Sequence, residues 1–114
     1  CVEDGPRASF IMKLDDDVFM HHWALLPLLQ QRLAVGGYTV IGLFHECERA
    51  RTVERKGKYQ QSTEAYPWPF YPVYPEGGGY ILSAAVARAL GQTRYEACRN
   101  RLLANEDASL GVWI

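Results

Sequence analysis

The hydrophobic positions of this 114-residue chain fall into short runs with either strand-like or helix-like spacing. Three runs are short, apolar and rich in β-branched or aromatic residues, which predicts strands over residues 9–14, 38–44 and 80–82. Apolar side chains recur at helical spacing over residues 21–33 and 84–90, which predicts two helices. Strands interspersed with helices indicate an α/β fold.

Residues that favour helix ends support these assignments and add two more helices. Pro27 interrupts the first helix and fits only if it lies in the first turn. Ser83 is a good N-cap for the second helix, and Gly91 a suitable stop. Residues 94–103 predict another helix, and Asn105 predicts the N-cap of a last one.

The middle of the chain lacks a regular period. Residues 45–61 are charged, which predicts an exposed loop. Residues 66–75 hold four prolines, which should exclude a helix or a central strand and leave an extended segment lined with rings. The triplet Gly77, Gly78 and Gly79 then leads into the third strand.

Composition narrows the class of protein. Hydrophobic residues make up 48% and charged residues 22% of the chain, an ordinary globular balance. The net charge of −1 argues against a general nucleic-acid-binding protein, which would carry a basic stripe. Cys1, Cys47 and Cys98 lack the spacing of a zinc site, and scattered thiols are favoured over a disulfide.

The ends of the chain suggest part of a larger domain. The chain opens at Cys1 without an initiator Met and stops at Ile114, so we expect residues 1–114 to be one portion of a longer protein. No apolar run approaches the roughly 20 residues that span a bilayer. We therefore expect any membrane anchor to lie outside this segment.

Three consecutive aspartates, Asp15, Asp16 and Asp17, follow the first predicted strand. Adjacent carboxylates repel one another unless a cation or hydrogen-bond donors lie among them. Strand alternation would point Asp15 and Asp17 to the same side, and hard carboxylate oxygens suit Mn²⁺ or Mg²⁺ bound to diphosphate. A solvated acidic turn or a helix N-terminus explains the triplet equally well.

The glycine triplet and the aromatic segment each allow two interpretations. Gly77, Gly78 and Gly79 could let the backbone approach a phosphate or a sugar, or could simply form a tight turn. Rings over residues 68–74 could stack on sugars, pack on the core or present an extended stretch to a partner. Alone, each feature favours the plainer interpretation.

Glu106 and Asp107 lie at the start of the last predicted helix. A carboxylate there could act as a general base, and the helix N-terminus should keep it ionised. Helix capping is the commoner use of such residues.

Taken in order, these segments resemble the β-1,3-galactosyltransferase and β-1,3-N-acetylglucosaminyltransferase family, especially its plant-type members. The resemblance rests on residues 13–19, 71–83 and 105–111. It implies the C-terminal part of a GT-A domain, a Rossmann-like mixed sheet flanked by helices. The uridine-binding half would precede Cys1, and a further metal-ligating His would follow Ile114, so we expect the isolated chain to be inactive.

The implied activity is an inverting, metal-dependent transfer of galactose or N-acetylglucosamine from a UDP-sugar to a hydroxyl, giving a β-1,3 bond. By this resemblance Asp17 is the best metal ligand for Mn²⁺ or Mg²⁺, and Asp15 supports the metal or the nucleotide ribose. Asp16 would lie near the donor sugar. The same comparison assigns the donor-sugar pocket to Gly77, Gly78 and Gly79.

On the acceptor side, the resemblance makes Asp107 the catalytic base. Glu106 and Trp68 would contact a glycan or glycoconjugate acceptor. The family also implies the lumenal side of the Golgi membrane. Two alternatives remain: a non-catalytic carbohydrate-binding module derived from such an enzyme, and a Mg²⁺-dependent phosphotransfer enzyme that uses the acidic triplet.

Overall fold

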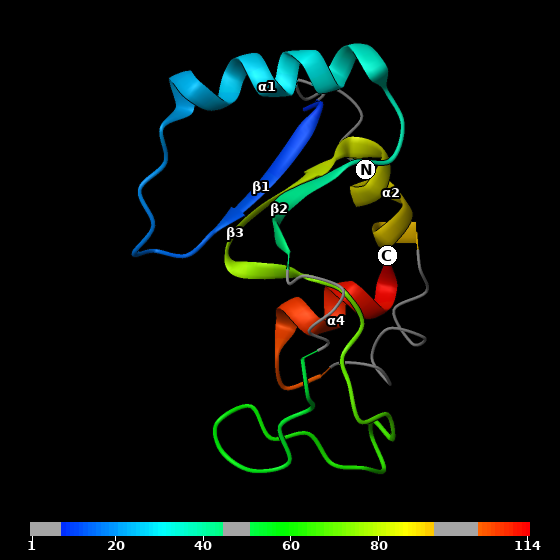
Figure 1. Cartoon of the computed structure of the whole chain (residues 1–114). Coiled ribbons are helices and arrows are strands. Elements are labelled where there is room, and N and C mark those ends of the chain that lie inside the picture. Colours follow the sequence, from blue (N-terminus) through cyan, green and yellow to red (C-terminus); the bar gives the residue numbers. More distant parts are fainter. Residues whose placement is uncertain (1–7, 45–50, 93–102) are drawn as a thin grey trace.

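The computed structural model describes residues 8–44, 51–92 and 103–114, which form a small α/β arrangement (Figure 1). Its elements, in chain order, are β1 (Phe10–Leu14), α1 (His22–Val35), β2 (Val40–Phe44), β3 (Pro75–Ser83), α2 (Ala84–Gln92) and α4 (Glu106–Trp113). The three strands form one sheet in the order β1-β3-β2. The predicted helix over residues 94–103 lies almost wholly outside the described residues, as do all three cysteines.

The sheet is antiparallel at both of its interfaces, so the expected mixed sheet is wrong for this part of the chain. β3 is the central strand, and it pairs Gly79 with Leu14 of β1 and Leu82 with Val40 of β2. β1 and β2 are parallel to each other but never pair, because β3 runs between them in the opposite direction. Consequently, the end of β1 and the start of β3 lie at the same edge of the sheet (Figure 1).

β3 is longer than the predicted strand over residues 80–82. It starts at Pro75, which pairs with Phe44. The expectation that the four prolines of residues 66–75 exclude a central strand is therefore wrong for the last of them, Pro75. Proline is tolerated at the first residue of a strand. Gly77, Gly78 and Gly79 also belong to β3 and have negative φ, so they form no tight turn.

Helices α1 and α2 each end two residues beyond the ends predicted from the sequence, at Val35 and Gln92. Ser83 caps α2 as predicted, since its Oγ accepts from the Val86 amide at 3.4 Å, but the helix continues through Gly91. Pro27 is the sixth residue of α1, beyond the first turn. It is exposed, and water can satisfy a carbonyl that a proline leaves unpaired on the solvent side.

The main apolar core lies between α4 and the segment that precedes β3. Tyr71 and Tyr74 are buried and meet edge to face, with ring centroids 6.0 Å apart. Ala108 of α4 is fully buried in the same cluster. Gln61 is also buried, and its Oε1 accepts from the Ala104 amide at 2.8 Å, so the region expected to be an exposed loop is tied to the helical end of the chain.

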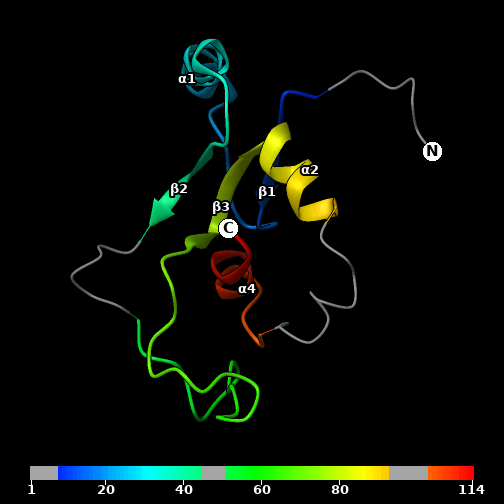
Figure 2. The ribbon, with the colours of Figure 1, turned by 90° about the vertical axis from the view of Figure 1, so that its right-hand side faces the viewer.

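Helix α1 lies apart from this core, at the opposite end of the sheet from α4 (Figures 1 and 2). None of its residues is buried, and Trp23, Leu26 and Leu33 are each more than half exposed. Among the described residues, no helix combines the length and hydrophobicity that a bilayer-spanning segment requires.

Two helical glycines give opposite predictions for substitution by alanine. A Cβ on Gly111 in α4 would lie 2.6 Å from the Tyr74 Cβ and 2.8 Å from the Val73 carbonyl oxygen. Gly111→Ala should therefore destabilise the protein by roughly 1–3 kcal/mol. Gly91 in α2 has no neighbour within 4 Å, so Gly91→Ala should stabilise it by up to about 1 kcal/mol.

Chemical denaturation of the natural full-length protein measures both changes. Equal effects at the two positions would contradict the close packing of α4 on the segment before β3.

Candidate active site

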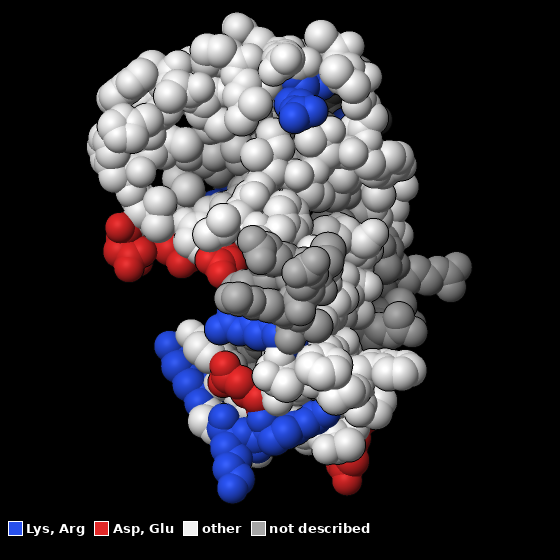
Figure 3. Space-filling view, viewed as in Figure 1, with Lys and Arg blue, Asp and Glu red and all other residues white. Residues whose placement is uncertain are grey.

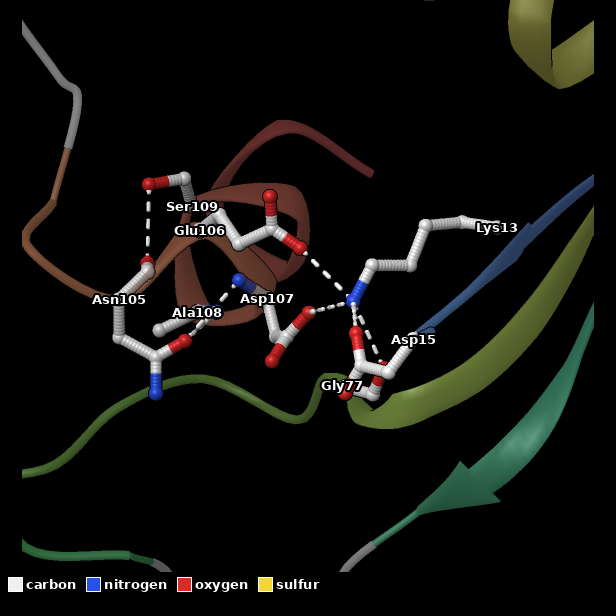
Figure 4. A network of polar contacts seen from close by, with 8 residues as sticks. All are labelled: Lys13, Asp15, Gly77, Asn105, Glu106, Asp107, Ala108 and Ser109. Carbon is white, nitrogen blue, oxygen red and sulfur yellow. Dashed lines mark hydrogen bonds and ion pairs between the residues drawn. The ribbon is translucent and has the colours of Figure 1, made fainter. Parts of the chain in front are cut away.

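A lysine connects three segments at the edge of the sheet where β1 ends and β3 begins (Figure 4). The Lys13 ammonium, near the end of β1, donates to Asp15 Oδ1 at 2.7 Å and to the Gly77 carbonyl oxygen at 2.7 Å. It also lies 3.0 Å from Glu106 Oε1 and 3.9 Å from Asp107 Oδ1, both at the start of α4. Residues distant in sequence thus meet around one cation.

The position of Lys13 follows from strand geometry. It is the fourth residue of a five-residue strand, paired with Tyr80, and its side chain is 29% exposed. The hydrogen bond that Lys13 donates to Asp15 raises the pKa of Lys13 well above its ordinary value, although desolvation opposes this. The hydrogen bond to Glu106 and the charges of Glu106 and Asp107 raise it further. The sequence interpretation missed this residue, although a lysine within an apolar strand requires a partner and so could have indicated it.

The start of α4 is fixed by the predicted N-cap. Asn105 Oδ1 accepts from the amides of Asp107 and Ala108 at 3.0 and 3.3 Å, which satisfies donors that a helix start leaves free. The Glu106 side chain is 69% exposed, whereas that of Asp107 is 14% exposed. The cap therefore holds one carboxylate toward solvent and the other toward the sheet.

Burial and neighbouring charges act on the pKa of Asp107 in addition to the helix N-terminus. Burial raises the pKa of Asp107, Lys13 lowers it, and Glu106 and Asp15 raise it further. Asp107 Oδ1 is buried and has no hydrogen-bond partner among the described residues. A carboxylate whose burial raises its pKa is a stronger proton acceptor than an exposed one.

The three glycines of β3 do not share one environment. A Cβ on Gly77 would collide with the Asp107 carboxylate, and one on Gly79 would lie 2.8 Å from Leu14 Cδ2. A Cβ on Gly78 would have no neighbour within 4 Å. Gly77 thus gives space to a carboxylate of the protein itself, and Gly78 has open space beside it.

The aspartate triplet lies beyond the strand that precedes it. β1 ends at Leu14, and the Val18 amide donates to the Asp15 carbonyl at 3.3 Å across a turn that contains Asp16 and Asp17. The argument from strand alternation is therefore wrong for Asp15 and Asp17. All three aspartates are exposed, and acidic atoms gather at this turn on the molecular surface (Figure 3).

The described residues contain no group of three or more His, Cys, Asp or Glu side chains that could enclose a metal ion. Mg²⁺ often takes only one or two protein carboxylates when substrate phosphates and water complete its coordination. The exposed turn with Asp15 and Asp17 fits a cation shared with a phosphate ligand, and it does not fit a closed structural site.

A mainly apolar cavity of about 440 Å³ adjoins this turn, between the sheet and the start of α1. Gly78 and Gly79 of β3 line it, together with the segment that follows the acidic turn and Leu25 of α1. The space-filling view is hollowed in this region, above the acidic atoms (Figure 3). Gly77, in contrast, contacts Lys13 through its carbonyl, at the side where α4 begins.

The predicted aromatic cluster divides into two parts. Tyr71 and Tyr74 are buried in the core, whereas Trp68 and Phe70 are exposed by 66% and 49%. Arg55 holds the loop that carries Trp68, because its guanidinium donates to the Tyr66 and Trp68 carbonyls at 2.9 Å. Trp68 is thus the most exposed ring of this cluster.

The α/β arrangement, with an acidic turn, an open glycine strand and a partly buried carboxylate at one edge, suits an enzyme that transfers a group from a phosphate-bearing donor. Sequence comparison identifies the family of enzymes, because the galactosyltransferase family model matches residues 1–114. The chain belongs to this family.

The relatives of this chain include an N-acetylglucosaminyltransferase and a galactosyltransferase. Human lactosylceramide 1,3-N-acetyl-β-D-glucosaminyltransferase is 34% identical over 110 residues, covering 94% of this chain and 28% of that protein. Arabidopsis thaliana hydroxyproline O-galactosyltransferase GALT5 is 33% identical over 107 residues, covering 94% of this chain and 15% of that protein. The chain therefore spans less than a third of the length of either relative.

The contact between Gly77 and Asp107 can be tested with a matched pair of alanine variants. Gly77→Ala should displace the Asp107 carboxylate and destabilise the protein by roughly 1–3 kcal/mol, the usual effect of overpacking. Gly78→Ala should change stability by less, because its Cβ enters open space. Both glycines have negative φ, so neither variant introduces backbone strain.

Thermal unfolding of the two variants and a crystal structure of Gly77→Ala provide the measurement. An unmoved Asp107 side chain in that structure would contradict the contact.

Proposed function

We propose that the protein to which these residues belong transfers galactose or N-acetylglucosamine from a UDP-sugar to an acceptor hydroxyl, with inversion and a β-1,3 linkage. Family membership supports hexosyl transfer. The observation that carries the residue assignment is the meeting of Asp107, Glu106 and the acidic turn around Lys13.

Asp107 is the proposed general base. It would accept the proton of the acceptor hydroxyl as that oxygen attacks the donor sugar, which needs one direct displacement and no covalent intermediate on the protein. Burial favours this role because it strengthens the carboxylate as a proton acceptor. Its Oδ1 makes no hydrogen bond to another described residue and lies 3.9 Å from the Lys13 ammonium.

The donor side is proposed to be the acidic turn and the adjoining glycines. Asp15 and Asp17 would hold Mn²⁺ or Mg²⁺, which when bound offsets the negative charge that develops on the departing diphosphate. Asp16 would lie beside the donor sugar. Of the three glycines, Gly78 has open space at its Cα and Gly79 lines the cavity, so these two suit a ligand better than Gly77.

The acceptor side is proposed to include Trp68 and Glu106. Trp68 is exposed on a loop held by Arg55, and an exposed indole ring offers an apolar face to the C–H side of a sugar. Glu106 is the more exposed of the two carboxylates of α4 and could accept a hydrogen bond from an acceptor hydroxyl.

The cellular setting is proposed from the family alone. We place the protein on the lumenal side of the Golgi membrane, anchored by a segment other than residues 1–114. The relatives are several times longer than this chain, so activity belongs to the natural full-length protein. The isolated 114 residues should turn over a UDP-sugar poorly.

Replacement of Asp107 tests the enzymatic proposal. With a panel of UDP-hexoses, Mn²⁺ and hydroxyl acceptors, the full-length protein should release UDP with UDP-galactose or UDP-N-acetylglucosamine. Asp107→Asn keeps the side-chain shape and should lower kcat by roughly 100- to 10,000-fold, the range for loss of a general base. UDP binding, measured by calorimetry, should remain.

Three other outcomes would contradict the proposal. Sugar binding without UDP release by the wild type would indicate a carbohydrate-binding module. Release of inorganic phosphate from nucleotides would indicate a phosphotransfer enzyme. Wild-type turnover by Asp107→Asn would exclude Asp107 as the base.

The shared cation site can be tested by binding alone. The described residues contain no cluster of three or more metal-ligating side chains. Mn²⁺ should therefore bind weakly by itself and at least about tenfold more tightly with UDP present, as expected when phosphates complete the coordination. Asp17→Asn should remove this gain, and Glu64→Gln, at an exposed carboxylate in the loop before β3, should preserve it. Equal Mn²⁺ affinity with and without UDP would contradict a shared site.

A further inference from the structure

Lys13 has a role that the assignment of donor and base residues leaves open. We propose that Lys13 is a positioning residue, which orients the Asp107 carboxylate and ties the start of α4 to the acidic turn. This inference rests on the proposed function, because it assigns the support of the proposed base. Lys13 itself would touch neither the donor sugar nor the acceptor.

Lys13 contacts three segments that are separate in the sequence. Its ammonium makes short hydrogen bonds to the turn after β1 and to the backbone of β3, through Asp15 and Gly77. Its third close partner is Glu106 of α4 at 3.0 Å. An ammonium group has three protons, so these three partners use its full donor capacity.

The distance to Asp107 is what distinguishes positioning from direct bonding. Lys13 Nζ lies 3.9 Å from Asp107 Oδ1, which is too long for a hydrogen bond but short enough for attraction between charges. The carboxylate is therefore held toward the cation while its oxygen keeps a lone pair.

Lys13 is also the only basic side chain among the described residues that the structure places against Asp107. The other charged or titratable groups around that carboxylate are Glu106 on α4, Asp15 after β1 and Tyr80 on β3. Glu106 and Asp15 both raise the pKa of Asp107, whereas Lys13 lowers it. Without Lys13, the base would remain partly buried among negative charges, in an arrangement that favours protonation.

Two variants of Lys13 separate charge from position. Lys13→Met keeps the aliphatic stem and removes the charge, so kcat should fall by roughly 10- to 100-fold, with a smaller change in KM for the UDP-sugar. The acid limb of the kcat profile should move to higher pH, because Asp107 loses the positive charge that favours its ionised form. Lys13→Arg keeps the charge but changes its geometry, so kcat should fall by roughly fivefold or more while the acid limb stays in place.

Lys56→Met is the matched control, since Lys56 is an exposed lysine on the loop before β3. It should leave kcat and the pH profile unchanged. The double variant Lys13→Met with Asp107→Asn should be no slower than Asp107→Asn alone, because a residue that acts through the base has no effect once the base is gone.

Each outcome bears on one of the two proposals. If Asp107→Asn abolishes turnover but folded Lys13→Met keeps wild-type kcat and acid limb, the positioning role is wrong and the base assignment remains. If Lys13→Met does not fold, Lys13→Arg decides, and a wild-type kcat in that variant overturns the inference. Wild-type turnover by Asp107→Asn would instead overturn the proposed function.

Discussion

Helix α4 can approach the sheet closely because glycine occurs at two of its contacts. Gly111, inside the helix, lies against the backbone of Val73 and Tyr74, and Gly77 of β3 lies against the carboxylate of Asp107. A methyl group at either position would overlap atoms already there. Since proteins are packed as densely as organic crystals, the overlap at Gly111 can be relieved only by moving the helix or the segment before β3. The overlap at Gly77 would displace the Asp107 carboxylate. The position of Asp107 beside β1 and β3 depends on this close packing.

The same packing brings together three carboxylates, whose mutual repulsion is offset by the positive charge of Lys13. Three carboxylates, from Asp15, Glu106 and Asp107, converge at one edge of the sheet around a single ammonium group. Removal of water from a carboxylate disfavours its charged form, so Asp107 has a raised pKa even beside this cation. In this arrangement burial raises the pKa of Asp107 and the neighbouring Lys13 lowers it.

The proposed donor and acceptor regions take up different sides of this edge. The cavity lined by Gly78 and Gly79 lies toward α1, whereas Gly77, Asp107 and Glu106 lie toward α4. One continuous strand therefore contributes to both regions, and β3 can set the separation between a donor sugar and a base. No residue of α1 is buried, and the carboxylates around Lys13 are held by β1, β3 and α4.

Local signals determined much of this protein from its sequence. Residue types and their spacing predicted the strands near Phe10–Leu14 and Val40–Phe44, the caps at Ser83 and Asn105, and the family. These features can be predicted because strand propensity, capping and motif spacing act over a few residues. The tertiary structure alone decided that β3 begins at Pro75, that the acidic triplet lies on a turn, and that Gly77 faces Asp107. It also decided the role open to Lys13, whose partners include a carbonyl 64 residues away. Long-range packing and shared charge have no local pattern, because they depend on which segments the fold brings together.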